Sequence, residues 1–200
     1  MNIAVFCSGN GSNFQAIIDA VKSGYIPAKI ALMVSDNKGA KACERASRAG
    51  VETLILDKKN FKTRENFDLK VLKSLKKKDV GLVALAGFMR IISPHFTREY
   101  KNKILNIHPA LLPSFKGTRG VKDALEYGVK VTGVTVHFVD EHLDNGPIIL
   151  QKAVEIGEND TEESLVERIH KIEHELYPEA IKLFVEGKLK IKGRKVYIAG

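Results

Sequence analysis

The sequence contains few cysteines and no long apolar run. Its two cysteines, Cys7 and Cys43, form neither a CxxC pair nor a zinc-type spacing, and two thiols cannot build a disulfide framework. The longest apolar run, residues 80–89, is far shorter than the ~20 residues of a membrane-spanning helix. Residues 1–6 lack a basic start and are too short for the apolar core of a signal peptide. We therefore expect a cytoplasmic protein with reduced thiols and no membrane partner.

Internal repeats, low-complexity tracts and linkers rich in proline, glycine or serine are also missing from the sequence. Hydrophobic residues make up 44% of the chain and charged residues 28%, close to globular averages, which argues against a disordered or collagen-like chain. At 200 residues, the chain is long enough to bury a core without disulfides. We expect a single domain, residues 1–200.

The net charge is +8, which makes nucleic acids, membrane surfaces and anionic small molecules worth considering as partners. The basic excess lies mainly in residues 57–103, whereas residues 104–185 are acidic overall. The run Lys76–Lys78 ends a predicted helix, where positive charge offsets the helix dipole. No aromatic RNA-binding motif or zinc finger accompanies it. We expect no nucleic-acid partner and interpret the excess mostly as solvated surface.

The first half of the chain alternates short β-branched runs with segments of helical periodicity. Residues 80–86 are apolar on both faces, as a central strand of a parallel sheet requires. These features predict a Rossmann-like α/β fold, built on a single open, mostly parallel twisted sheet flanked by helices. The predicted strands are 3–7, 30–35, 52–56 and 80–86, and the predicted helices are 14–22, 41–49 and 63–77.

The second half of the chain predicts a different arrangement. A strand at 104–107 precedes a long loop, 108–118, and two longer strands, 131–139 and 147–156, are joined by a polar turn that favours antiparallel pairing. A capping-box sequence at 161–164 opens a long helix to Val185, and residues 189–198 form a closing hairpin. Ligands of open α/β sheets bind beyond the carboxyl ends of the strands, so residues there are the first candidates for a site.

A glycine-containing loop, residues 8–13, follows the first predicted strand and precedes a helix. Backbone N–H groups of such a loop converge on an anion, and the helix N-terminus adds a positive dipole end. The dinucleotide fingerprint would need a glycine where Phe14 stands, and the Gly-Lys-Ser/Thr of the phosphate-loop motif is missing. The loop therefore predicts a monophosphate site, with a capped tight turn as the alternative.

Asn106 and His108 stand two residues apart at the end of a predicted strand, so their side chains share one face. An amide donor and an imidazole can together stabilise an oxyanion and move a proton. An aspartate in the polar turn 140–147 could orient His108 or favour its charged form. A structural histidine and a merely solvated acidic turn are the alternatives.

His170 and His174 lie four residues apart on the long predicted helix, a spacing that can place two side chains on one metal ion. The HExxH motif is absent and the sequence offers no evident third ligand, so we expect no metal.

Four motifs in register resemble the phosphoribosylglycinamide formyltransferases, the folate-dependent transformylases of purine biosynthesis. They are residues 8–13 (SGNGSN), 85–93 (LAGFMRIIS), 106–113 (NIHPALLP), and 136–139 (VHFV) with 143–147 (LDNGP), and their order and spacing match over nearly the whole chain. Each motif alone would be weak, whereas the four together are specific. The resemblance implies a formyltransferase domain with a phosphate-binding β/α half, 1–103, and a catalytic and folate-binding half, 104–200.

The resemblance implies that the amine of glycinamide ribonucleotide attacks the formyl carbon of the co-substrate 10-formyltetrahydrofolate, with no metal and no covalent enzyme intermediate. It assigns catalysis to Asn106 and His108, which hold the formyl oxygen as an oxyanion forms, and to Asp144, which supports the charge of His108 and helps to relay protons through water. His108, as an imidazolium, would act as the general acid. One well-placed oxyanion donor lowers such a barrier by ~3–4 kcal/mol.

The resemblance also implies which residues bind the two substrates. The ribonucleotide site comprises Gly11, Ser12, Asn13, His170 and Glu173. The folate site comprises Arg64, Met89, Arg90, Ile91, Ile92, Asn106, Asp140, Glu141, His142, Leu143 and Asp144. The apolar segment 88–92 suits a flat pterin ring, and a core plug at a strand end is its alternative interpretation.

Residues 114–120 (SFKGTRG) depart from the usual family pattern, which has a proline before the glycine and often histidines after it. The segment resembles a mobile lid over the folate site. Lys116 and Arg119 could meet the glutamate carboxylates of the folate.

Relatives share the Asn-x-His and Asp core, so these residues alone do not identify the formyl acceptor. Methionyl-tRNA formyltransferase would carry a further C-terminal domain, and formyltetrahydrofolate hydrolase would carry an N-terminal regulatory domain; we expect neither here. The hydrolase and a non-catalytic nucleotide- or RNA-binding module remain the alternative functions. Both a monomer and a homodimer are compatible with the sequence.

Overall fold

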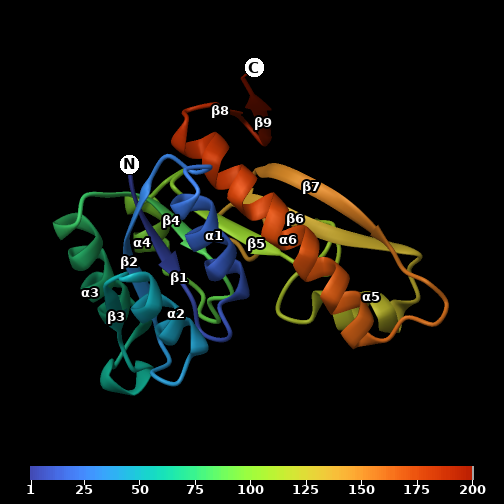
Figure 1. Ribbon diagram of the computed structural model, residues 1–200, viewed down its shortest axis with the longest axis horizontal. Helices are drawn as coiled ribbons and strands as arrows, with labels where there is room; N and C mark the ends of the chain where they lie inside the picture. The colour runs from blue at the N-terminus through green and yellow to red at the C-terminus, as the bar shows by residue number, and fades with distance from the viewer. Residues whose placement is uncertain (200) are drawn as a thin grey trace.

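The computed structural model describes residues 1–199, in which the strands form one nine-stranded sheet (Figure 1). The strands are β1 (Asn2–Phe6), β2 (Lys29–Ser35), β3 (Thr53–Ile55), β4 (Val80–Leu85), β5 (Ile104–His108), β6 (Val131–Phe138), β7 (Ile148–Glu155), β8 (Leu189–Lys192) and β9 (Lys195–Ile198). Their order is β3-β2-β1-β4-β5-β6-β7-β9-β8. The first five strands in this order, β3, β2, β1, β4 and β5, pair in parallel. Strand β6 pairs antiparallel with both of its neighbours, β5 and β7. The predicted sheet is confirmed.

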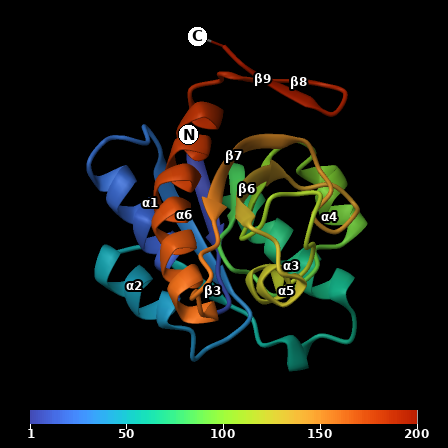
Figure 2. The ribbon, with the colours of Figure 1, turned by 90° about the vertical axis from the view of Figure 1, so that its right-hand side faces the viewer.

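Helices cover both faces of this sheet. They are α1 (Ser12–Lys22), α2 (Lys41–Ala49), α3 (Arg64–Lys77), α4 (Pro94–Glu99), α5 (Gly120–Tyr127) and α6 (Glu162–Val185), with a 3₁₀ turn, η1, at Lys58–Asn60. Ile3 and Val5 of β1 belong to the hydrophobic cluster formed with α1, α2 and α6, while Ala4 and Phe6 belong to the one formed with α3 and α4. Figure 2 shows these helix groups on opposite sides of the sheet. Because successive side chains of a strand point to opposite faces of the sheet, each face has its own hydrophobic core.

The predicted boundaries lie within two residues of the observed ones, but two helices were not predicted. Helix α4 has clear start signals: the Ser93 hydroxyl accepts a hydrogen bond from the Phe96 N–H, and Pro94 occupies the first turn. Its six residues are too few to show a helical period. Helix α5 begins at Gly120, the last residue of the predicted lid. Within residues 1–199, no helix is both long and apolar enough to cross a membrane.

Tyr177 connects α6 to the centre of the sheet. Its buried hydroxyl lies 2.9 Å from the carbonyl oxygen of Leu85 and 3.0 Å from that of Leu105. Burial raises the pKa of Tyr177, so the hydroxyl keeps the proton that it donates. Leu85 ends β4 and Leu105 directly precedes Asn106 on β5. The longest helix is therefore anchored at the strand ends from which the candidate site is built.

Replacing Tyr177 with Phe removes this anchor and leaves two buried carbonyl oxygens without their hydroxyl donor. We expect the free energy of unfolding to fall by about 1–3 kcal/mol, measured by urea denaturation. Tyr127→Phe is the matched control because the Tyr127 side chain is 80% exposed, and its effect should stay within about 0.5 kcal/mol. Equal stability losses in both variants would contradict an anchoring role for the Tyr177 hydroxyl.

Candidate active site

The candidate site begins at the carboxyl end of β5, where the sheet changes from parallel to antiparallel pairing. Asn106 lies opposite Leu85 of β4 on one side and His137 of β6 on the other. Leu105 and Ile107 face the core formed with α1 and α6, so Asn106 and His108 share the opposite face. Asn106 and His108 therefore share one face of the strand, as their spacing predicts.

Asp144 lies between two histidines. Its Oδ2 atom is 3.5 Å from His108 Nδ1, and its Oδ1 atom is 3.8 Å from His137 Nε2. Both histidines are almost fully buried, and the Asp144 side chain is 9% exposed. Asn106 Nδ2 lies 3.2 Å from His137 Nε2, which links the amide to the same cluster. The fold thus brings together Asn106, His108 and Asp144, as predicted.

Each ring nitrogen of His108 faces an oxygen. Nε2 lies 2.8 Å from the carbonyl oxygen of Phe115, which can only accept, so Nε2 carries a proton and donates. Nδ1 faces the Asp144 carboxylate. Only the doubly protonated imidazolium presents an N–H to both oxygens. The surroundings of His108 therefore suit a positively charged ring.

His137 belongs to this cluster, although the sequence analysis included it only in the motif 136–139 and gave it no role. Its Nδ1 lies 2.7 Å from the carbonyl oxygen of Phe138 and so carries the proton of the neutral ring. Burial lowers the pKa of His137, which favours that neutral form. Nε2 is then an acceptor for the Asn106 amide. The alternation of the 131–139 strand, paired antiparallel with β5, was the signal that could have found it.

The turn that carries Asp144 is held in an unusual backbone conformation. Asp144 has a φ of 45°, in the left-handed region that non-glycine residues seldom occupy. The Asp140 carboxylate accepts hydrogen bonds from the His142 N–H and the Asn145 side chain, which closes the turn. A Cβ atom at Gly146 would lie 1.8 Å from the Phe138 carbonyl oxygen, so only glycine fits there. These contacts direct the Asp144 carboxylate toward the two histidines.

The predicted lid, residues 114–120, lies against this cluster. Besides the Phe115 contact with His108, the Gly117 N–H donates to Asp144 Oδ2 at 2.8 Å, and Lys116 Nζ donates to Asn145 Oδ1 at 3.3 Å. Arg119 instead pairs with Asp123 and Glu126 of α5, at 3.1 and 2.9 Å. Lys116 therefore lies beside the candidate site, whereas the charge of Arg119 is balanced by its own helix.

The glycine loop lies at the N-terminus of α1. Gly11 is the helix N-cap with a φ of 72°, and no side chain caps the helix. Asn13 Nδ2 donates to Glu173 Oε2 of α6 at 2.8 Å, so two predicted ribonucleotide ligands from distant parts of the sequence meet. Burial raises the pKa of Glu173.

His170 lies one helical turn before Glu173, and its ring stacks on that of His174 with centroids 6.1 Å apart. Among residues 1–199 there is no group of three or more side chains that could hold a metal ion.

The predicted folate residues come from four segments: the start of α3, the loop after β4, strand β5 and the turn after β6. Met89 and Ile91 are more than 60% exposed, and Leu143 is 54% exposed, an apolar surface suited to a flat ring. Ile92 is instead buried in the core with α3 and α4.

Individual contacts fix the position of the loop after β4. The Met89 N–H donates to Ser8 Oγ at 2.9 Å, and the Arg90 guanidinium lies 4.2 Å from the Phe67 ring centroid. Ser93 N–H donates to buried Asp68 at 2.7 Å. Neither Ser8 nor Asp68 was predicted as a folate contact. Of the other predicted residues, Arg64 pairs with Glu65 and Glu141 with Arg98.

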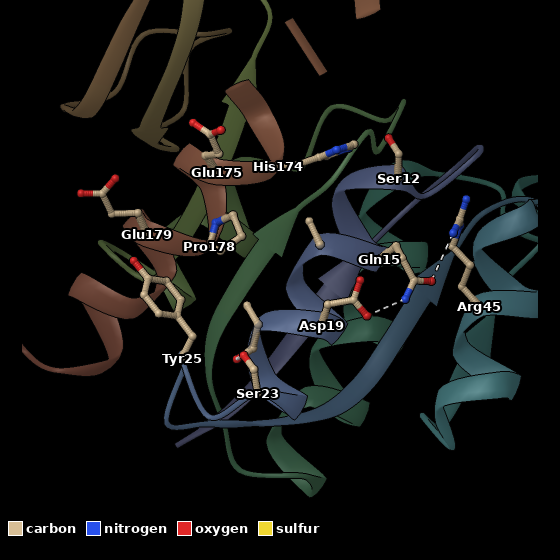
Figure 3. A pocket seen from close by; sticks show the side chains of 12 residues that line it. Ser12, Gln15, Asp19, Ser23, Tyr25, Arg45, His174, Glu175, Pro178 and Glu179 are labelled. Carbon is tan, nitrogen blue, oxygen red and sulfur yellow. Dashed lines mark hydrogen bonds between the residues drawn. The ribbon is translucent and has the colours of Figure 1, made fainter. Parts of the chain in front are cut away.

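A groove of about 920 Å³ lies between α1 and α6, outside the predicted catalytic cluster (Figure 3). Ser12, Gln15, Arg45 and His174 surround one part of it, and Tyr25 and Glu179 lie in another. None of the three predicted catalytic side chains lines it. The groove shares Ser12 with the predicted ribonucleotide site.

Comparison with known proteins identifies the family of this chain. Residues 1–181 match the family model described as formyl transferase. A phosphoribosylglycinamide formyltransferase of Bacillus subtilis is 47% identical over 90% of this chain and 92% of its own length. A trifunctional purine biosynthetic protein adenosine-3 of Chironomus tentans is 45% identical over 96% of this chain, which spans only 14% of that longer protein.

Solved structures agree with this result. A glycinamide ribonucleotide transformylase 1 from Symbiobacterium toebii superposes with a TM-score of 0.98 at 48% identity, covering 100% of this chain and 94% of its own. The match at both the sequence and the structural level extends over the predicted site as well as the sheet. The chain therefore belongs to the formyl transferase family.

Proposed function

We propose that the chain transfers a formyl group from 10-formyltetrahydrofolate to the amine of N1-(5-phosphoribosyl)glycinamide, a step of de novo purine biosynthesis. The observation that carries the proposal is the buried cluster of Asn106, His108 and Asp144 at the end of β5. The Bacillus subtilis and Symbiobacterium toebii relatives, whose names specify this acceptor, support it over nearly their full lengths. Since Cys7 and Cys43 are both free thiols, we place the reaction in the reducing cytoplasm.

The reaction makes one carbon–nitrogen bond and breaks another. The neutral amine of the ribonucleotide attacks the formyl carbon, and the formyl oxygen becomes an oxyanion in the tetrahedral intermediate. The bond from that carbon to N10 of the folate then breaks. The attacking nitrogen loses one proton and N10 gains one, so the enzyme must stabilise the oxyanion and move protons.

Asn106 is the oxyanion donor in this proposal. One N–H of its amide donates to Nε2 of neutral His137, which leaves the other N–H free for the formyl oxygen. His137 is thereby a positioning residue, because its own Nδ1–H is held by the Phe138 carbonyl. A donor fixed in advance stabilises developing charge without the cost of reorienting it.

His108 is the general acid, and Asp144 holds it in the charged form. With Nδ1 facing Asp144, the proton on Nε2 is the one available for N10. In this structure Nε2 donates to the Phe115 carbonyl oxygen, so the folate must displace that part of the lid to receive the proton. Asp144, through water, accepts the proton that the amine releases.

The two substrates occupy the two sides of this cluster. We assign the ribonucleotide to Gly11, Ser12, Asn13, His170 and Glu173. We assign the folate to Arg64, Met89–Ile92, Asn106 and Asp140–Asp144. The division into a phosphate-binding half, 1–103, and a catalytic and folate-binding half, 104–200, belongs to the same proposal.

The direct test is the release of tetrahydrofolate from 10-formyltetrahydrofolate, followed with and without the ribonucleotide. We expect release only when the ribonucleotide is present. Release that ignores the ribonucleotide would instead identify a hydrolase. No release in either case would contradict a formyltransferase.

Replacing His108 with Ala removes the proposed general acid. Turnover in the same assay should fall by about 10²–10⁴-fold, with a much smaller loss of ribonucleotide affinity. His95→Ala provides the control because His95 is an exposed residue of α4 outside the proposed site, and its turnover should match that of the unaltered chain. A His108→Ala variant with near-normal turnover would exclude this mechanism.

The neutral state of His137 can be tested by its titration. Burial holds its pKa below the ordinary value of 6.5, so between the two values the unfolded chain binds more protons than the folded one. The contribution of His137 to stability is therefore present above pH 6.5 and is lost as the pH falls toward the lowered pKa. Nitrogen NMR should show a midpoint below 6.5 and a proton on Nδ1 in the neutral ring. A higher midpoint, or a neutral ring protonated on Nε2, would contradict the proposed support of Asn106.

A further inference from the structure

Two arginines of α2, Arg45 and Arg48, have different surroundings. Arg48 pairs with Glu44 on its own helix at 3.6 Å, and both side chains are more than 70% exposed. Arg45 instead reaches the glycine loop and the first turn of α1. Its Nε donates to the Asn10 carbonyl oxygen at 2.9 Å, its Nη2 to Asn10 Oδ1 at 3.3 Å, and its Nη1 to Gln15 Oε1 at 3.1 Å. Figure 3 shows the contact between Arg45 and Gln15 at the edge of the groove.

Helix α2 also packs directly against the glycines of this loop. The Ala42 N–H donates to the Gly9 carbonyl oxygen at 3.2 Å. A Cβ atom on Gly11 would lie 2.8 Å from the Ala42 Cβ, and Gly11 has a φ of 72°, so both the space and the backbone conformation require glycine. Consecutive carbonyl groups of the loop, at Gly9 and Asn10, are therefore hydrogen-bonded to α2.

These bonds determine where the loop directs its donors. In a trans peptide unit the C=O and the following N–H point in opposite directions. With the Asn10 carbonyl held by Arg45, the Gly11 N–H is turned away from α2. The N–H groups at the start of α1 have no acceptor within the helix, and no side chain caps them. They are the donors that a phosphate would meet.

We infer that Arg45 is a positioning residue, which holds the loop 9–13 in the conformation that binds the phosphate of the ribonucleotide. The inference rests on the proposed function, but Arg45 is not among the residues assigned to either substrate. The planar guanidinium suits the task because it meets three oxygens at once, which an ammonium group does less well.

The charge of Arg45 supports the same role. Among residues 1–199, Arg45 forms no ion pair with a carboxylate, and its three acceptors are uncharged oxygens. His174, across the groove, has a pKa lowered mainly by burial and further by His170 and Arg45. An unbalanced positive charge next to the loop adds attraction for a dianionic phosphate.

The first test uses the full chain and compares the effect of each variant on two constants, the KM for the ribonucleotide and the KM for 10-formyltetrahydrofolate. Arg45→Ala should raise the KM for the ribonucleotide about 10-fold or more, since it removes charged hydrogen bonds that hold the loop. The KM for 10-formyltetrahydrofolate should change less than twofold. Arg45→Lys should recover only part of the loss, and Arg48→Ala, the matched control on the same helix, should change neither constant. Equal increases in both constants for Arg45→Ala would show a merely structural role and overturn the inference.

The second test does not depend on the reaction. Inorganic phosphate is titrated into the full chain while the amide NMR signals of Gly11, Ser12 and Asn13 are followed. Phosphate should shift these signals in the unaltered chain and in Arg48→Ala, with an affinity about 10-fold weaker in Arg45→Ala. An unchanged affinity in Arg45→Ala would overturn the inference even if the enzyme uses the ribonucleotide. A chain that binds phosphate in this way but never formylates the ribonucleotide would refute the proposed function alone.

Discussion

The architecture of the site depends on one buried carboxylate placed between two histidines. A carboxylate as enclosed as that of Asp144 is costly unless cations or hydrogen-bond donors face it. His108 and the Gly117 N–H supply those partners from two different segments. Both ring nitrogens of His108 face oxygens, an arrangement that suits an imidazolium, whereas burial lowers the pKa of His137 and favours its neutral ring. The two rings can therefore perform different tasks at one site.

The change of pairing direction in the sheet makes this cluster possible. The parallel strands bring the glycine loop after β1 and the loop after β4 to one edge, where Ser8 joins them through Met89. The antiparallel pairing of β6 with β5 then sets His137 opposite Asn106. The turn between β6 and β7 places Asp144 beside His108 and His137. The first half of the chain thus supplies the loops after β1 and β4, and the second half supplies the amide, the acid and the carboxylate.

The sequence predicted the parts of this arrangement that depend on local pattern. Asn106 and His108 followed from alternation at a strand end, and the long helix α6 from its capping box, whose reciprocal hydrogen bonds are present. The glycine loop and an aspartate in the turn 140–147 also followed from the residues, whereas the choice of Asp144 and the remaining ligands came only from the family resemblance. His137 was missed because its place depends on the register between β5 and β6, which no single segment encodes. Arg45 was missed for a similar reason, since its contacts arise from the packing of α2 against a loop thirty-five residues earlier.

The measurement that tests the account most directly follows the formyl carbon itself. The chain is incubated with the ribonucleotide and 10-formyltetrahydrofolate labelled with ¹³C in the formyl group, and carbon NMR identifies the product that carries the label. The account predicts that the label appears in the formyl amide of the ribonucleotide, with tetrahydrofolate formed in equal amount. Label found in free formate, whether or not the ribonucleotide is present, would contradict it.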